Sequence, residues 1–168
     1  MKASPRTLII ALALVVLLFL GWRLLDAEGR ERRAIEHRLH ELAAHLEKDG
    51  PTSLLGTGAS AVQFLDFFTP NAEVDLDYNG HKLSGHNALK STYLLIHRQV
   101  DTLSLTISES RIDLAPDRRS ASASVLVNVR ATHTSHTESE RREYTLTLEK
   151  HGDWKVRHAE HAKPLLRR

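Results

Sequence analysis

The sequence predicts an α+β domain that follows one apolar, membrane-spanning segment. Three observations lead to this class. Residues 7–22 are uncharged and almost wholly apolar. Residues 28–99 hold three segments with the apolar spacing of amphipathic helices, interrupted by one short hairpin. After Val100 apolar and polar side chains alternate as they do in half-buried strands. A run of helices followed by a run of strands is typical of α+β domains.

The apolar segment extends from Thr7 to Trp22, between Arg6 and Arg23. As a helix it would span about 24 Å, slightly less than a hydrocarbon core of about 30 Å. The flanking arginines can reach the two headgroup layers, and Trp22 lies where an interfacial aromatic anchor is expected. We therefore expect residues 1–25 to comprise a short N-terminal tail and a transmembrane signal-anchor helix.

A cleaved signal peptide is the alternative interpretation of this segment. Lys2 and Arg6 form a plausible charged region before it, but signal peptidase needs small residues at positions −3 and −1. The best candidate site, Leu25-Asp26-Ala27, has a bulky residue at −3, and the chain has no cysteine to carry a lipid. The sequence therefore favours an uncleaved anchor.

Two arguments about the orientation of the anchor in the membrane disagree. More positive charges follow the apolar segment than precede it, which would place the domain in the cytoplasm. However, acidic residues are interleaved with those arginines, and long domains translocate largely regardless of charge. A six-residue tail before the apolar run also matches a signal-anchor. We favour a single-pass protein of the inner (cytoplasmic) membrane with its N-terminus inside and its domain outside the cytoplasm.

The charge distribution argues against a nucleic-acid partner. The chain has 23 Lys and Arg against 21 Asp and Glu, and a pI near 9.0. Six of the basic residues flank the apolar segment or lie in the C-terminal tail, so residues 26–162 are net acidic. No basic stripe interleaved with aromatic residues appears, and such a stripe is the electrostatic footprint of nucleic-acid binding.

The first segment of the domain is a strongly helical stretch from Glu28 to Lys48. Its apolar residues recur at helical spacing and form one narrow stripe on a charged cylinder. Gly50-Pro51 ends it. The stripe covers barely two heptads, so packing against its own domain is favoured over a coiled-coil seam. The stripe residues are Ile35, Leu39, Leu42 and Leu46.

Shorter elements follow. Residues 59–68 are expected to form a short helix with Ala61, Val62, Leu65 and Phe68 facing inward. Residues 72–78 alternate as a half-buried strand that ends at the turn signal Asn79-Gly80. Residues 86–99 then read as a helix, capped by Ser84 or Asn87.

The last part of the domain is expected to be four long antiparallel strands. A change of parity between Ile107 and Ile112 predicts a bulge or bend near residues 109–111. Turns are expected at residues 116–119 and 151–153, and the last strand begins at Trp154. The domain organisation is therefore an anchor at residues 1–25, one α+β domain at residues 26–162, and a basic tail at residues 163–168.

Three motifs give the chain a resemblance to the nuclear transport factor 2-like superfamily, also called the SnoaL-like or cystatin-like cone. They are the helix end and first strand at residues 67–74, Leu83-Ser84-Gly85-His86-Asn87-Ala88-Leu89 at the start of a helix, and the final hairpin at residues 152–156. The resemblance covers about residues 28–162. It implies a curved antiparallel sheet wrapped around about three helices, with a conical cavity between them.

The resemblance also implies a range of functions. Members of this superfamily include isomerases, dehydratases and polyketide cyclases, as well as binding or assembly domains without chemistry. Single-pass versions with a cone outside the cytoplasm occur as scaffold subunits of envelope-spanning secretion machines. Fold alone does not choose among these functions.

The chain has eleven histidines, which are common metal ligands, but their spacing does not support a metal site. Three lie on the polar side of the first helix, and His158-Ala159-Glu160-His161 lacks the spacing of a zincin motif. The absence of cysteine excludes disulfides, zinc–thiolate sites and a cysteine nucleophile. No hydrolase, P-loop or dinucleotide motif is present. We expect neither a metal nor another cofactor, and we assign no catalytic residue.

Four residues are candidates for lining a ligand cavity. Extending the strand alternation places His133 on the apolar side of its strand, and His158 and Glu160 on the apolar side of the last strand. Tyr93, on the third helix, could donate a hydrogen bond. The alternative is that these strands have left the core at these positions and that the side chains are hydrated.

Two hypotheses about function remain. The first is a membrane-anchored, non-catalytic domain of the cell envelope that binds a protein partner, or a second copy of itself, and assists assembly. The second is a domain that binds or transforms a small apolar ligand near the membrane, as SnoaL-like isomerases, cyclases or dehydratases do. The anchor favours the first, because an enzyme acting on a diffusing metabolite gains little from a tether.

Overall fold

The computed structural model describes residues 27–50, 54–75, 82–134 and 136–162. The expected anchor at residues 1–25, the Asn79-Gly80 turn and the tail at residues 163–168 lie outside these ranges. Within them, no helix combines the length and the apolar composition that crossing a bilayer requires.

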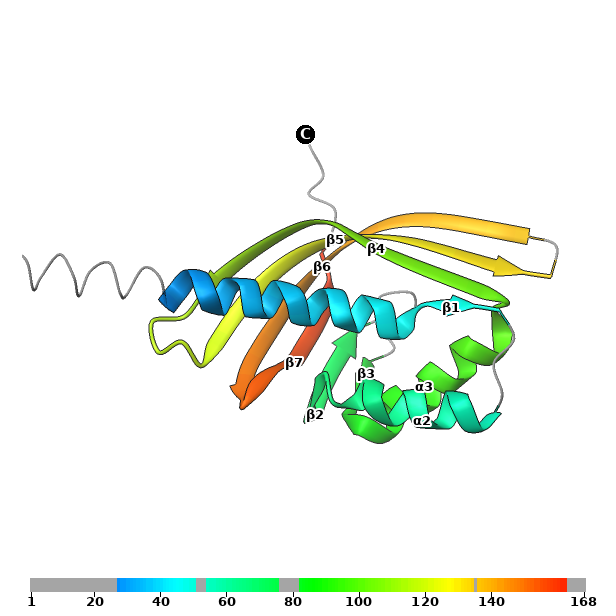
Figure 1. Ribbon diagram of the computed structural model, residues 1–168, viewed down its shortest axis with the longest axis horizontal. Coiled ribbons are helices and arrows are strands. Elements are labelled where there is room, and N and C mark those ends of the chain that lie inside the picture. Colours follow the sequence, from blue (N-terminus) through cyan, green and yellow to red (C-terminus); the bar gives the residue numbers. More distant parts are fainter. Residues whose placement is uncertain (1–26, 51–53, 76–81, 135, 163–168) are drawn as a thin grey trace, which may run out of the picture.

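The described elements follow the order that the sequence predicts, with helices early and long strands late (Figure 1). A long helix occupies residues 27–46. The remaining elements are β1 (Lys48–Asp49), α2 (Leu54–Leu65), β2 (Phe68–Asp75), β3 (Lys82–Ser84), α3 (Gly85–Gln99), β4 (Thr102–Leu114), β5 (Ser120–His133), β6 (His136–His151) and β7 (Asp153–His161).

These strands form one curved sheet in the order β1-β4-β5-β6-β7-β2-β3. Strands β4 to β7 are consecutive antiparallel neighbours, as expected. The sheet is not antiparallel throughout, because β2 pairs with β7 in parallel. The β2–β3 hairpin thereby covers the edge that β7 would otherwise expose. The predicted α+β class and the curved sheet wrapped around helices are confirmed.

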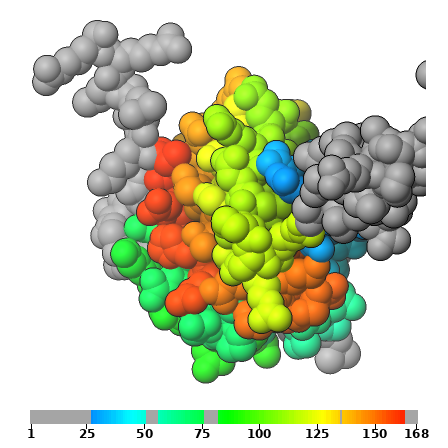
Figure 2. All heavy atoms as spheres, turned by 90° about the vertical axis from the view of Figure 1, so that its left-hand side faces the viewer, coloured from blue at the N-terminus to red at the C-terminus, as the bar shows by residue number. Residues whose placement is uncertain are grey.

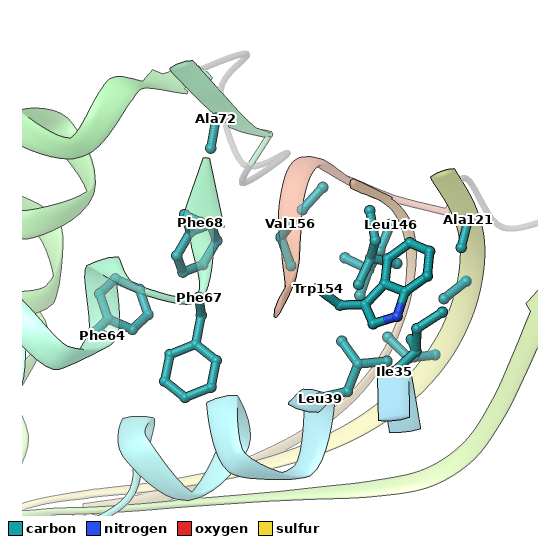
Figure 3. Packing of buried hydrophobic residues seen from close by; sticks show 14 of the residues in the cluster. Ile35, Leu39, Phe64, Phe67, Phe68, Ala72, Ala121, Leu146, Trp154 and Val156 are labelled. Carbon is teal, nitrogen blue, oxygen red and sulfur yellow. The ribbon is translucent and has the colours of Figure 1, made fainter. Parts of the chain in front are cut away.

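The long helix lies across the concave face of the sheet (Figure 1). Its stripe residues Ile35 and Leu39 are 0% and 3% exposed, and they point toward Trp154 and Leu146 of the sheet (Figure 3). Leu42 and Leu46 are partly buried against the same core. The stripe therefore packs against its own domain, as the sequence analysis favoured.

One end of the molecule brings together the start of this helix and two turns of the sheet (Figure 2). The backbone N–H of Lys150 donates to the carbonyl of Arg119, which joins the β4–β5 turn to the end of β6. The ammonium of Lys150 also binds the carboxylate of Glu31 on the long helix at 2.5 Å. Backbone and side-chain bonds thus fix the first turns of the helix to the sheet.

Several boundaries differ from expectation: the long helix ends at residue 46 rather than at Lys48, and β2 begins at Phe68 rather than at residue 72. Helix α2 begins at Leu54 rather than at residue 59, although Gly56 and Gly58 lower the helix propensity there. Further along α2, the ring of Phe64 stacks on Tyr93 of α3. Val62, which was expected to face inward, is 55% exposed. Phe64 is buried instead, and Phe68 belongs to β2.

The bulge expected near residues 109–111 lies slightly earlier. Ile107 pairs with Val127 and Glu109 pairs with Leu126, so Ser108 is the extra residue of β4. Its hydroxyl donates to the carbonyl of Leu126 at 3.2 Å. The change of apolar parity in the sequence therefore located the irregularity to within a residue or two.

Replacing Ile35 by Ala should destabilise the domain by about 2–5 kcal/mol, because a fully buried side chain leaves a cavity. Urea unfolding of the full chain in detergent measures this loss. Val62→Ala, at an exposed position, is the control and should change stability by less than about 0.5 kcal/mol. A change of oligomeric state without loss of stability in Ile35→Ala would instead support the coiled-coil interpretation.

Candidate functional site

A pocket of about 380 Å³ lies where the end of the long helix, β1, α2 and α3 meet. Both polar and aromatic side chains line it. Each helix contributes at least one of them, so the pocket belongs to the helical side of the domain rather than to the long strands. The lining side chains used below are His45, Glu47, Lys48, Ser60, Tyr93 and His97.

Tyr93 and His97 form the wall contributed by α3. They are four residues apart, which places them on one face of the helix, and they are 3% and 8% exposed. Their rings stack with centroids 4.2 Å apart, and Tyr93 also stacks on Phe64 at 4.9 Å. The Tyr93 hydroxyl donates to the carbonyl of His45 at 3.2 Å. Burial raises the pKa of Tyr93, and a hydrogen bond with Ser60 opposes that rise only in part.

The His97 imidazole is a buried polar group that is not satisfied. Its Nε2 has no hydrogen-bond partner among the described residues. Burial lowers the pKa of His97, because the charged form loses its hydration, and the positive charge of Lys48 lowers it further. His97 is therefore neutral near pH 7.

Two side chains hydrogen-bond to the backbone carbonyls at the C-terminal end of α3. The ammonium of Lys48 donates to the carbonyls of His97 at 2.8 Å and of Val100 at 2.5 Å. The Nδ1 of His133 lies 2.8 Å from the carbonyl of Gln99 and can donate to it. Carbonyls at a helix C-terminus have no partners within the helix, and they favour positive charge. These contacts join α3 to β1 and β5.

The structure therefore separates the four residues predicted to line a cavity. Tyr93 lines the pocket described above. His133 lies at the end of β5 and contacts the end of α3. His158 and Glu160 lie on the other face of the sheet from Trp154 and Val156, so the inward orientation expected for them is wrong.

A β-bulge in β7 explains that difference. Leu148 pairs with Val156, but Thr147 pairs with His158, so Arg157 is an extra residue. One extra residue reverses the alternation of the strand beyond it. Ala159 is consequently buried at 7% exposure, opposite Leu146.

The outward face holds His158 between two carboxylates. Its Nδ1 is 3.9 Å from Glu73, and its Nε2 is 3.7 Å from Glu160. Both carboxylate side chains are more than half exposed, so the group is hydrated. The described residues contain no group of three or more His, Asp or Glu side chains placed to hold a metal ion.

Neither His97 nor Lys48 was predicted from the sequence as a site residue. A signal for His97 was available, because Leu89, Tyr93 and His97 are spaced four apart and form the buried stripe of α3. A histidine on such a stripe is expected to be buried. Nothing comparable pointed to Lys48, whose role depends on contacts about fifty residues away in the chain.

Comparison with known proteins identifies the fold. No family model and no curated protein sequence matches the chain. Among solved structures, a proposed scytalone dehydratase from Novosphingobium aromaticivorans superimposes with a TM-score of 0.69 and 21% identity, over 85% of this chain and 98% of the other. An NTF2-like superfamily protein from Salmonella enterica gives 0.66 and 11% identity, over 84% and 96%.

A third structure gives the same result. It is an NTF2-like protein with a cystatin-like fold from N. aromaticivorans, with a TM-score of 0.59 and 14% identity over 89% of each chain. At these identities the likeness establishes the fold. The chain therefore has the NTF2-like fold that its motifs predicted.

The stability of the domain should fall as the pH drops below about 6.5, the ordinary pKa of histidine. The pKa of His97 is lower in the folded state than in the unfolded chain. The unfolded chain therefore binds the proton first, and stability is lost on acidification. Urea midpoints at pH 8 and pH 5 measure the loss. His97→Phe should reduce it, whereas an equal loss in that variant would assign it to other groups.

Proposed function

We propose that this chain is a membrane-anchored, non-catalytic binding domain of the cell envelope, built on the NTF2-like fold. The observation that carries the proposal is the placement of the candidate acid–base groups. His133 contacts the end of a helix, and His158 and Glu160 face away from the concave core. The core between the long helix and the sheet is filled by apolar side chains such as Ile35 and Trp154 (Figure 3). Binding requires no acid–base pair in that space, whereas catalysis there would.

The membrane part of the proposal rests on the sequence. Residues 7–22 form an apolar segment with the length and the flanking charges of an anchor. We further propose that this segment is uncleaved and single-pass in the inner membrane, with the domain outside the cytoplasm. The long helix of the domain is described from residue 27, shortly after this segment. The domain would therefore be held close to the bilayer.

A protein partner or a second copy of the chain is the binding partner that we favour. In the part of the chain that the structure describes, two large apolar side chains are strongly exposed: Val62 on α2 at 55% and Leu95 on α3 at 53%. Helices α2 and α3 pack against each other. Their outer surface is where we expect contact, because exposed apolar side chains gain most from being covered.

A second candidate function is binding or conversion of a small molecule, as in a SnoaL-like enzyme. The observation in its favour is the pocket of about 380 Å³ beside Tyr93 and His97. One of the structurally similar proteins is a proposed scytalone dehydratase. A nucleic-acid partner is not part of either proposal.

The anchor should remain attached to the mature protein. Intact-mass measurement should find Met1 or Lys2 at the N-terminus, and carbonate extraction should leave the protein in the membrane. The double variant Leu14→Asp/Leu17→Asp should release it, because each charge costs about 2.5–3.5 kcal/mol at the centre of a membrane helix. A mature species that begins at Glu28 would contradict the proposal.

Partner contact can be mapped with single cysteines, because the chain has none of its own. Val62→Cys and Leu95→Cys, treated with a bifunctional reagent in native membranes, should each give a discrete adduct. Asp113→Cys, exposed on β4, is the control and should give none. The adduct's mass distinguishes a second copy of the chain from another protein. Identical behaviour at all three positions would contradict the proposed surface.

A further inference from the structure

The charges of the domain are unevenly distributed. One end brings together the first turns of the long helix, the β4–β5 turn and the β6–β7 turn (Figure 2). We define this basic end as residues 27–33, 115–119 and 150–153. It holds six basic and four acidic side chains, whereas the rest of residues 34–162 holds eleven basic and sixteen acidic ones. The six basic residues are Arg30, Arg32, Arg33, Arg118, Arg119 and Lys150.

The acidic groups that the long helix contributes to the basic end are already paired. The carboxylate of Glu28 binds the guanidinium of Arg32 at 2.7 Å. The carboxylate of Glu31 binds the ammonium of Lys150 and accepts a hydrogen bond from the indole of Trp154. These pairs are neutral within the domain, so the excess of positive charge comes from the other basic residues.

The β4–β5 turn presents two arginines from a tightly bonded backbone. The carboxylate of Asp117 accepts hydrogen bonds from the backbone N–H groups of Arg119 and Ser120 at 2.9 and 3.3 Å. The backbone N–H of Arg118 donates to the carbonyl of Ala115, and Arg118 has a φ of 54°, which side chains other than glycine rarely adopt. The guanidinium groups of Arg118 and Arg119 form no hydrogen bond or ion pair with the other described residues. They are therefore available to a partner outside the domain.

The predicted anchor brings the basic end to the surface of a bilayer. The anchor is predicted to end at residue 25, and the described helix begins at residue 27. Consecutive Cα atoms are about 3.8 Å apart, so these two residues are at most about 8 Å from each other. The headgroup layer on each side of the hydrocarbon core is roughly 5–8 Å thick. The basic end is therefore the part of the domain nearest to the lipid phosphates.

We propose that the basic end docks on a bilayer surface that contains anionic phospholipids, with Arg118 and Arg119 beside the phosphates. The negative potential of such a surface attracts Lys and Arg side chains over a distance that the ionic strength sets. Docking would leave the exposed Val62 and Leu95 on α2 and α3, at the far end of the molecule (Figure 1), open to a protein partner. The inference rests on the membrane anchor proposed above, which brings the surface within reach.

Nanodiscs of two lipid compositions test the inference on the full chain. One kind contains phosphatidylcholine alone, the other also contains phosphatidylglycerol, and both carry a nitroxide-labelled headgroup that quenches fluorescence at short range. Because the chain has no cysteine, a fluorophore can be attached at His151→Cys, in the β6–β7 turn, or at His136→Cys, an exposed position at the other end of β6. The label at position 151 should be quenched more strongly in the anionic discs, and the label at position 136 should respond little to the lipid.

Two double variants assign the docking to the β4–β5 turn. Each basic residue near an anionic surface changes the ratio of docked to undocked molecules by about five-fold. Arg118→Gln/Arg119→Gln should therefore lower that ratio at least about five-fold in the anionic discs. Arg130→Gln/Arg141→Gln removes two exposed arginines outside the basic end and should leave it unchanged. In the wild type, about 1 M NaCl shortens the Debye length to about 3 Å and should remove the difference between the discs.

Several results would overturn the inference. They are equal quenching at position 151 in the two kinds of disc, equal effects of the two double variants, or stronger quenching at position 136 than at position 151. If Arg118→Gln/Arg119→Gln does not fold, the salt dependence of the wild type decides. An absence of quenching in the discs, together with a protein adduct at His151→Cys in native membranes, would assign the basic end to a protein partner.

Failure of the anchor gives a different result. A chain that does not remain with the discs would contradict the proposed anchor. A chain that remains with them and shows no dependence on the lipid would contradict this inference alone.

Discussion

The contact between the long helix and the end of the sheet is the constraint on which the rest of the fold depends. Glu31 accepts a hydrogen bond from the indole of Trp154 at 2.9 Å and binds the ammonium of Lys150. The bond from Lys150 is the largest cause of the lowered pKa of Glu31, and burial only partly opposes it. One turn further along the helix, Ile35 is fully buried beside the same indole (Figure 3). Polar and apolar contacts thus fix the rotation of the long helix about its axis. This rotation determines which side chains the C-terminal end of the helix presents to α2 and α3.

Much of this fold could be predicted from the sequence because its strongest signals are local and periodic. Helix α3 was identified to within one residue, since its apolar spacing is regular over more than a dozen residues. The parallel pairing of β2 with β7 could not be predicted in this way, because it joins segments about ninety residues apart. Local propensity also misplaced the start of α2, because the helix includes two glycines that lower the propensity there.

The site was predicted less well, and one residue explains most of the failure. Extrapolating the alternation from Trp154 and Val156 assumes an uninterrupted strand. The extra residue at Arg157 breaks that assumption, and it turns His158 and Glu160 outward while Ala159 takes the buried position. Bulges have no strong sequence signature in a strand of mixed polarity. Tyr93 was named only as a possible hydrogen-bond donor on the third helix, and it lines the pocket because it lies on the buried stripe of α3.

The proposed anchor and the helical pocket lie at opposite ends of the long helix. Twenty residues of α-helix extend about 30 Å, and the helix of residues 27–46 separates the predicted membrane segment from His45 and Lys48. Along the chain, the whole length of this helix therefore lies between the predicted membrane segment and the pocket. The charged and polar side chains that line the pocket weaken the case for a lipid-like apolar ligand, which the sequence left open. Glu47, Lys48, Asp49 and Ser60 among the lining residues suit a water-borne molecule better than an acyl chain.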